Sequence, residues 1–185
     1  MYYNSGMVLL WTLISVLFLL LAICFVVMRF AALEIERRQE AVIEGLWSRR
    51  NRIPLLLEVV ARAEGEHGPK SDALLHANLR SHIIDLRDKL ASAAFTLPEQ
   101  IEMEKQMSDL IATVFRLDQE YSFLKQDLLF ISLKKEFEEI VEKIRIEIND
   151  YNFSFQKLAN YYRLPFLKIF ELIYRIGRKQ PLQLL

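Results

Sequence analysis

Residues that turn, cross-link or end a helix are scarce in this sequence of 185 residues. It has five glycines, five prolines and no alternating runs of β-branched residues. These absences argue against a sheet-rich fold and favour an all-α one. Cys24 is the only cysteine, so one chain cannot form a disulfide framework.

An excess of charge is also lacking. The chain has 24 basic and 24 acidic residues, which gives a formal net charge of zero. Nucleic-acid-binding proteins normally carry a basic stripe, so nucleic acid is not an expected partner. The charges are unevenly placed, because residues 99–147 hold twelve acids and seven bases, whereas residues 161–185 hold five bases and one acid.

Sequence signatures of catalysis are missing as well. There is no Gly-rich phosphate loop, H-E-x-x-H, C-x-x-C or G-x-S-x-G motif. Residues 64–67 form a single E-x-x-H, whereas a di-iron bundle needs two such pairs and two further carboxylates. His76 and His82 are six residues apart and do not lie side by side on a helix. We expect no enzyme activity, no metal and no other cofactor.

The sequence does contain one long uncharged run, from Val8 to Met28. As a helix these 21 residues would measure about 30 Å, the thickness of the hydrocarbon core of a bilayer. No basic residue precedes the run and no A-x-A site ends it, so we expect an uncleaved anchor rather than a signal peptide. The basic residues that follow it closely are Arg29, Arg37, Arg38, Arg49, Arg50 and Arg52. Basic flanks stay cytoplasmic, which predicts an outside N-terminus and a cytoplasmic C-terminal part.

Apolar residues spaced by three and four predict that the anchor helix continues to about Glu64. Pro54 lies inside this helix and is expected to kink it. Residues 65–69 are expected to form a turn. Its apolar stripe is Leu46, Ile53, Leu56, Val60 and Ala63. Arg49 falls on the same stripe. A buried guanidinium must either reach water along its own stem or pair with a carboxylate, and both alternatives stay open.

A second helix is expected to start at residue 71 or 72 and to stop before Pro98, and Thr96 and Glu99 are spaced as a capping box for a third. The seam of the third helix is Met103, Met107, Leu110, Val114, Leu117 and Tyr121. Residues 121–126 are expected to form a turn and Asp127 to cap a fourth helix, although no glycine or proline excludes one continuous helix. The seam of the fourth helix is Phe130, Leu133, Phe137, Ile140, Ile144, Ile148, Tyr151, Phe155, Leu158 and Tyr162.

These patterns predict an all-α protein with three parts. Residues 1–28 form the N-terminal tail and transmembrane anchor, residues 29–163 an antiparallel bundle of three to four long helices, and residues 164–185 a short amphipathic, basic C-terminal segment. Antiparallel packing is expected because a single helix cannot hide so long an apolar seam from water.

Two groups of charged residues are candidate interaction sites. Glu138, Glu139 and Glu142 form an acidic patch on the fourth helix, which either faces water or docks a basic partner. Glu139 and Glu142 are also the candidate partners of Arg49.

The second group lies in the C-terminal segment. Residues 164–176 are too short to span a bilayer and too apolar to stand alone in water. They can lie in the open end of the bundle or at the membrane interface, and we favour the interface. There the basic residues would contact anionic lipid. These residues are Lys168, Arg175, Arg178 and Lys179.

The order and spacing of several motifs resemble the LemA family. The family pattern R-R-x-D-L-I-P-x-L-V-E aligns on the proline with Arg49, Ile53, Pro54, Leu56, Glu58 and Val60, with Asn51 in place of the aspartate. Later positions that match are Tyr121, Leu124, Lys125, Phe130, Leu133, Ile144, Tyr151, Asn152 and Phe155. Ser122 replaces the turn proline and Ala159 the second asparagine. The resemblance implies a membrane-anchored antiparallel helical bundle, and it implies no reaction, cofactor or catalytic residue.

We therefore expect a non-catalytic interaction or scaffold protein at the cytoplasmic face of a bacterial plasma (inner) membrane. Its expected partners are membrane lipid and an unknown protein, and a homo-oligomer is possible. The alternative is a protein that organises or shapes the membrane through its amphipathic C-terminal helix.

Overall fold

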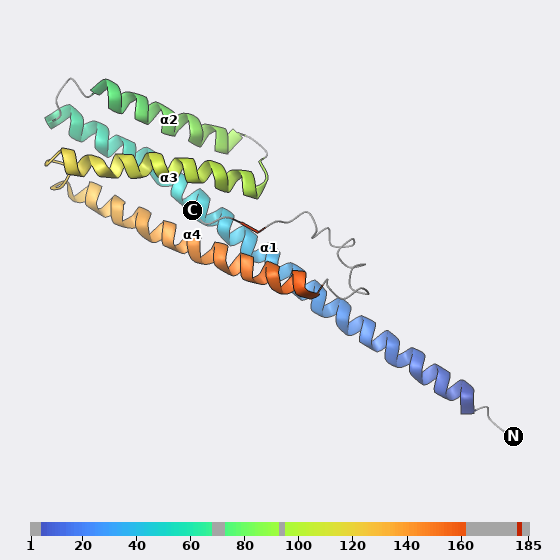
Figure 1. The fold of residues 1–185 in the computed structure, drawn as a ribbon. Helices are drawn as coiled ribbons and strands as arrows, with labels where there is room; N and C mark the ends of the chain where they lie inside the picture. The colour runs from blue at the N-terminus through green and yellow to red at the C-terminus, as the bar shows by residue number, and fades with distance from the viewer. Residues whose placement is uncertain (1–4, 68–72, 93–94, 162–180, 183–185) are drawn as a thin grey trace. The chain divides into compact units, whose positions relative to one another are not determined.

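A computed structural model of the protein describes residues 5–67, 73–92, 95–161 and 181–182. The described residues form the helices α1 (Ser5–His67), α2 (Ala73–Ser92), α3 (Leu97–Glu120) and α4 (Leu128–Tyr161), shown in Figure 1. The described part of the chain contains no strand, which confirms the predicted all-α class. The chain divides into two compact units, residues 1–37 with 152–180 and residues 38–151 with 181–185.

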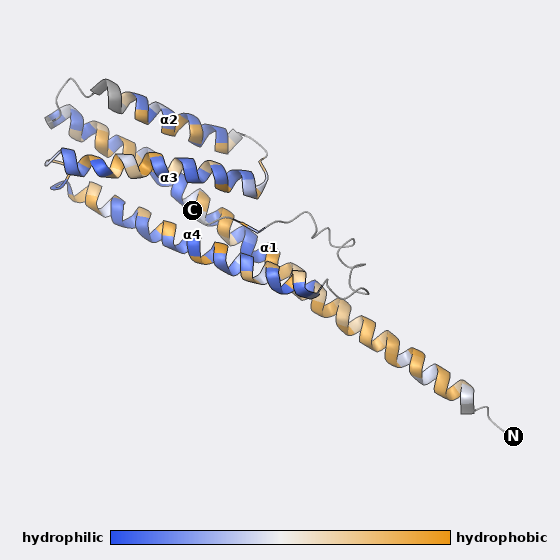
Figure 2. Ribbon diagram, viewed as in Figure 1, coloured by the Kyte–Doolittle hydropathy of each residue, from blue (hydrophilic) through white to orange (hydrophobic). Residues whose placement is uncertain are grey.

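The first unit contains the apolar start of α1. One 18-residue window of this helix has a mean hydropathy of 2.9, and none of that window is buried. Figure 2 shows apolar residues on all sides of this part of α1. The segment is therefore long and apolar enough to cross a membrane. Among the described residues of this unit, Met28, Ala32 and Ile35 of α1 and Leu158 of α4 are buried.

The second unit is a helical bundle built from the rest of α1, all of α2 and α3, and the start of α4. Its core is apolar and draws on all four helices. Its buried residues include Ile53, Leu56, Val60, Ile83, Met107, Val114, Phe130 and Phe137. The predicted α1 stripe is confirmed, since all five of its residues are buried. The ring of Phe115 meets those of Phe130 and Phe137 edge to face, with centroids 5.9 and 5.6 Å away, and this joins α3 to α4.

Helices α1 and α4 run antiparallel within the bundle. Arg38 pairs with Asp150 at 3.0 Å, whereas Arg52, two heptads later, pairs with Glu136 at 2.7 Å. Between these pairs Gly45 packs on the fully buried Ile144. A Cβ atom at position 45 would lie only 2.8 Å from Cγ1 of Ile144, so the close approach of the two helices requires glycine there.

The predicted break between the third and fourth helices is confirmed, and the alternative of one continuous helix is wrong. Residues 121–127 form the turn, and Asp127 accepts hydrogen bonds from the backbone N–H groups of Leu129 and Phe130 at 2.8 and 3.0 Å. The bond from Phe130 is the main reason why the pKa of Asp127 is lowered, and the nearby Arg62 adds to it. The carboxylate thus caps α4.

The other helix ends differ slightly from expectation. Helix α1 continues through Gly65 to His67, three residues beyond the predicted end. Helix α2 ends at Ser92, and the residues predicted to begin it lie outside the described part of the chain. At the start of α3 the predicted capping box is confirmed, since Glu99 accepts hydrogen bonds from both the backbone N–H and the hydroxyl of Thr96, each at 2.8 Å.

Candidate functional site: a buried charge network beside an apolar groove

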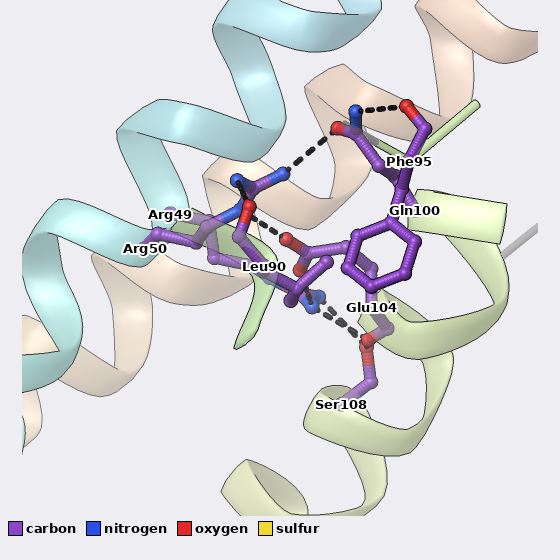
Figure 3. Close-up of polar contacts among 7 residues, drawn as sticks. All are labelled: Arg49, Arg50, Leu90, Phe95, Gln100, Glu104 and Ser108. Atoms are coloured by element: carbon purple, nitrogen blue, oxygen red, sulfur yellow. Dashed lines mark hydrogen bonds and ion pairs between the residues drawn. The ribbon is translucent and has the colours of Figure 1, made fainter. Parts of the chain in front are cut away.

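Arg49 lies at the centre of the bundle and is only 1 % exposed. Its Nη1 donates a hydrogen bond to the hydroxyl of Ser108 at 2.7 Å. Its Nη2 donates to the backbone carbonyl of Glu104 at 2.7 Å and to Oε2 of the same residue at 2.5 Å (Figure 3). The guanidinium therefore joins α1 to α3 and does not reach water along its stem.

The neighbouring arginine completes the network. Arg50 donates from Nε to Oε1 of Glu104 at 2.5 Å, and from Nη2 to the side-chain oxygen of Gln100 at 3.2 Å. Its Nη1 lies 3.4 Å from the carbonyl oxygen of Leu90 near the end of α2. One fully buried carboxylate thus accepts from two guanidinium groups, and the cluster ties three helices together.

The periodicity of each helix places these charges in the interior. Arg49 is a seam residue of α1, four residues before the buried Ile53. Glu104 is a seam residue of α3, because the buried positions of that helix are Leu97, Ile101, Glu104, Met107, Ile111, Val114 and Leu117. Each stripe therefore contains one charged residue among apolar ones, and the two charges meet at the same level of the bundle.

Burial is the largest influence on the pKa of the Arg49 guanidinium and lowers it. The charge and hydrogen bond of Glu104 act in the opposite direction, whereas the neighbouring Arg50 lowers the pKa further. Two cations face one anion, and Nε of Arg49 has no hydrogen-bond acceptor among the described residues. Because a guanidinium does not lose its proton in proteins, the cluster is suited to fixing helices rather than to moving protons.

An apolar groove of about 360 Å³ opens beside the network, between α3 and α4. Its apolar lining comes from Ile111, Ala112, Phe115, Phe137 and Val141. Its polar lining comes from Arg49, Ser108, Glu138, Glu142 and Arg145. The groove thus combines an apolar floor with charged residues at its margin.

A comparison with protein-family models shows which family this chain belongs to. The model of the LemA family matches residues 41–183. The chain belongs to the LemA family. No curated protein and no solved structure matches it.

The LemA motif residues mostly build the bundle. Arg49, Ile53, Leu56 and Val60 are buried, and at later matched positions so are Leu124, Phe130, Leu133, Ile144 and Tyr151. The family match begins at residue 41, so it covers the bundle and leaves out the apolar segment. The part of this chain that matches the LemA family is therefore chiefly its helical bundle.

The acidic patch lies on α4 as expected, but it does not pair with Arg49. Glu138, Glu139 and Glu142 are exposed. Glu139 lies 3.8 Å from Lys135, and Glu142 pairs with Arg145 at 2.9 Å. The prediction of Glu139 or Glu142 as the partner of Arg49 is wrong, because the buried stripe of α3 supplies Glu104 instead.

The sequence analysis missed Glu104, Gln100 and Ser108, and it gave Arg50 a role only among the basic residues that follow the apolar run. Glu104 continues the buried stripe of α3, because the steps from Ile101 to Glu104 and from Glu104 to Met107 are each three residues. That spacing was the available signal.

The remaining candidates give less information. Lys168, Arg175, Arg178 and Lys179 lie outside the described residues, so the predicted contact with lipid stays a prediction. Glu64, from the single E-x-x-H, pairs with Arg80 at 2.8 Å. Within the described residues there is no group of three or more His, Cys, Asp or Glu side chains that could hold a metal ion.

Proposed function

We propose that this LemA-family protein is a single-pass protein of a bacterial plasma membrane, and that its bundle acts in the cytoplasm as a non-catalytic interaction or scaffold protein. The carrying observation is that one helix, α1, contains both the apolar segment and the first core stripe of the bundle. Because the apolar segment and the first core stripe belong to one continuous helix, an apolar segment that is anchored in a membrane keeps the bundle at that membrane.

The distribution of charge supports the orientation and the interaction role. Six arginines lie within residues 29–52 and no basic residue precedes the apolar run, which favours a cytoplasmic bundle. The interior charges are engaged in joining helices, whereas the acidic residues of α4 are exposed and accessible to another protein. These features support a bundle that lies at the membrane with its acidic surface accessible to a protein partner.

The orientation is tested with single cysteines placed at Asn4 and at Asn78 in a Cys24→Ser background. In intact cells an impermeant thiol reagent should label the cysteine at position 4 and should not label the one at position 78. Both should be labelled after permeabilisation, which controls for access. The opposite pattern in intact cells would contradict the orientation.

The interaction role is tested by proximity labelling in cells with the full chain, against residues 1–37 carrying the same labelling enzyme. We expect proteins that are enriched by the full chain only. A set that does not differ from that of the anchor alone would contradict the role. Metal analysis of the purified protein tests the alternative of a metalloenzyme, and a stoichiometric metal would favour that alternative.

A further inference from the structure

The groove between α3 and α4 has the length of a helix docking site. Along α3 its lining extends from Ser108 to Ala112 and Phe115, and along α4 from Phe137 to Arg145. At 1.5 Å per residue these stretches measure about 10 and 12 Å. An amphipathic helix that lies in a groove uses anchors at i, i+3 or i+4, and i+7, which span about 10 Å. The apolar floor therefore fits two turns of a partner helix.

The charged residues at the margin of the groove indicate which charge a partner should carry. Of the two acidic lining residues, Glu142 is paired with Arg145. Glu138 forms no ion pair with another described residue, and Glu139 follows it directly on α4. The basic lining residues are already engaged, Arg49 by Glu104 and Arg145 by Glu142. Glu138 is therefore the one charged lining residue without an ion pair among the described residues, and this exposed carboxylate favours a basic group on the partner.

Arg49 offers a hydrogen-bond donor to an occupant of the groove. It is one of the residues that line the groove, it is almost completely buried, and its Nε–H lacks an acceptor among the described residues. A buried donor without an acceptor is costly, so an occupant that brings an oxygen to this end of the groove gains a hydrogen bond that the free bundle lacks.

We propose that this groove docks a basic amphipathic helix of a partner protein. Its apolar side chains fill the floor, a Lys or Arg faces Glu138, and one acceptor-bearing side chain within the apolar stripe reaches Nε of Arg49. This inference rests on the proposed interaction role and names the surface and the class of partner. An acyl chain with an anionic head is disfavoured, because Glu138 would repel the head.

The test uses the full chain in phosphatidylcholine nanodiscs and a labelled synthetic helix of 18 residues, made of Leu and Lys with one Gln in the middle of its apolar stripe. Binding is measured by fluorescence anisotropy and corrected with empty discs. We expect saturable binding that weakens as salt is raised. The same peptide with Glu in place of Lys should bind at least ten-fold more weakly.

Two variants and one matched control locate the site. Glu138→Lys reverses the charge at the margin, and Ala112→Phe fills the groove, and each should weaken binding about ten-fold. Glu102→Lys makes the same charge change at another exposed position of the bundle and should leave binding within two-fold. An unchanged melting temperature shows that a variant is folded. Since Glu138 is on the surface, its variant keeps the test valid if Ala112→Phe does not fold.

Several results would overturn the proposal. These are equal binding of the Glu peptide, insensitivity to both groove variants, and displacement of the Lys peptide by sodium laurate, which would identify an acyl-chain site. Replacing the central Gln by Leu should not improve binding, and a ten-fold gain would refute the hydrogen bond to Arg49.

Proximity labelling separates this failure from failure of the proposed function. If proteins enriched by the full chain persist with Glu138→Lys as they do with Glu102→Lys, the interaction role stands and the groove is not the docking site. If their enrichment is lost with Glu138→Lys only, the groove is supported in cells.

Discussion

Removing the carboxylate of Glu104 should destabilise the bundle more than removing the guanidinium of Arg49, although the two side chains form one pair. Glu104 is the only carboxylate that contacts Arg49 among the described residues, whereas Glu104 itself is shared between Arg49 and Arg50. Glu104→Met therefore strands a buried cation. Arg49→Met leaves Glu104 still paired with Arg50, which is itself largely buried.

The magnitudes follow from these contacts. Each ion pair contributes about 4 kcal/mol before desolvation is counted, at the effective dielectric constant of about 20 that describes protein sites. Glu104→Met removes two such pairs and relieves the desolvation of one carboxylate, so a net loss of about 3–5 kcal/mol is expected, the usual cost of breaking a buried pair. Arg49→Met removes one pair and leaves the hydroxyl of Ser108 without its donor, which should cost about 1–3 kcal/mol.

The double variant supplies the sharpest comparison. With Met at both positions no side chain in the cluster is a fully buried charge, because Arg50 keeps Gln100 and retains some exposure to solvent. Replacing a whole buried pair by apolar residues is often neutral or stabilising. The double variant should therefore be more stable than Glu104→Met alone, which is a strong departure from additivity.

The assay is urea unfolding of the full chain in detergent micelles, followed by circular dichroism at 222 nm. Glu102→Met, on the exposed face of α3, is the control and should change the free energy of unfolding by less than about 0.5 kcal/mol. The transition midpoints are compared at a constant slope, because a changed slope would mean a changed unfolding transition. A loss below about 1 kcal/mol for Glu104→Met, or a larger loss for Arg49→Met, would refute this description of the cluster.

Two further predictions concern helix packing and capping. Gly45→Ala should destabilise the bundle by about 1–3 kcal/mol because its Cβ would overlap Ile144. Ile144→Ala by itself should cost about 2–5 kcal/mol, and in that background the loss caused by Gly45→Ala should shrink. Losses that simply add in urea titrations would contradict the contact. Asp127→Ala should cost about 0.5–2 kcal/mol at pH 7 through loss of the α4 cap. The pKa of Asp127 is lowered in the folded protein, so the stabilisation by its carboxylate is present above the unfolded pKa and is lost as the pH falls from about 4 through the folded pKa. The difference in unfolding free energy between wild type and Asp127→Ala should therefore close over this pH range. A difference that stays constant with pH would exclude the ionised cap.

The stripes of α1 and α4 could largely be read from the sequence because burial imposes its period on a helix, whereas only Met107, Val114 and Leu117 of the six residues predicted for the seam of α3 are buried. The five predicted stripe residues of α1 are buried, and so are Phe130, Leu133, Phe137, Ile144, Ile148, Tyr151 and Leu158 of α4. The break before α4 was also visible, since Asp127 stands where a cap is required. These features are local, and local periodicity and capping chemistry suffice to predict them.

The partner of Arg49 could not be read in the same way, because it depends on the relative height of two helices. Arg49 contacts Glu104 within α3, and Arg62 contacts Asp127, which follows the C-terminal end of α3, so α1 and α3 run in the same direction. The spacing of apolar residues within either stripe does not determine this relative height. The acidic row of α4 was easier to see in the sequence than one glutamate within the seam of α3.

The same lack of encoded register gives the buried charges a role. A stripe of apolar residues spaced by three and four can slide by about two turns against another and still bury similar surface, because its pattern repeats every heptad. One arginine in the stripe of α1 and one glutamate in that of α3 allow a single register, since any slip would strand both charges in an apolar interior. We infer that Arg49 and Glu104 contribute more to fixing the alignment of the helices than to stability. One side of the groove depends on that alignment, because Arg49 of α1 lines it beside residues of α3, and the buried pair joins these two helices.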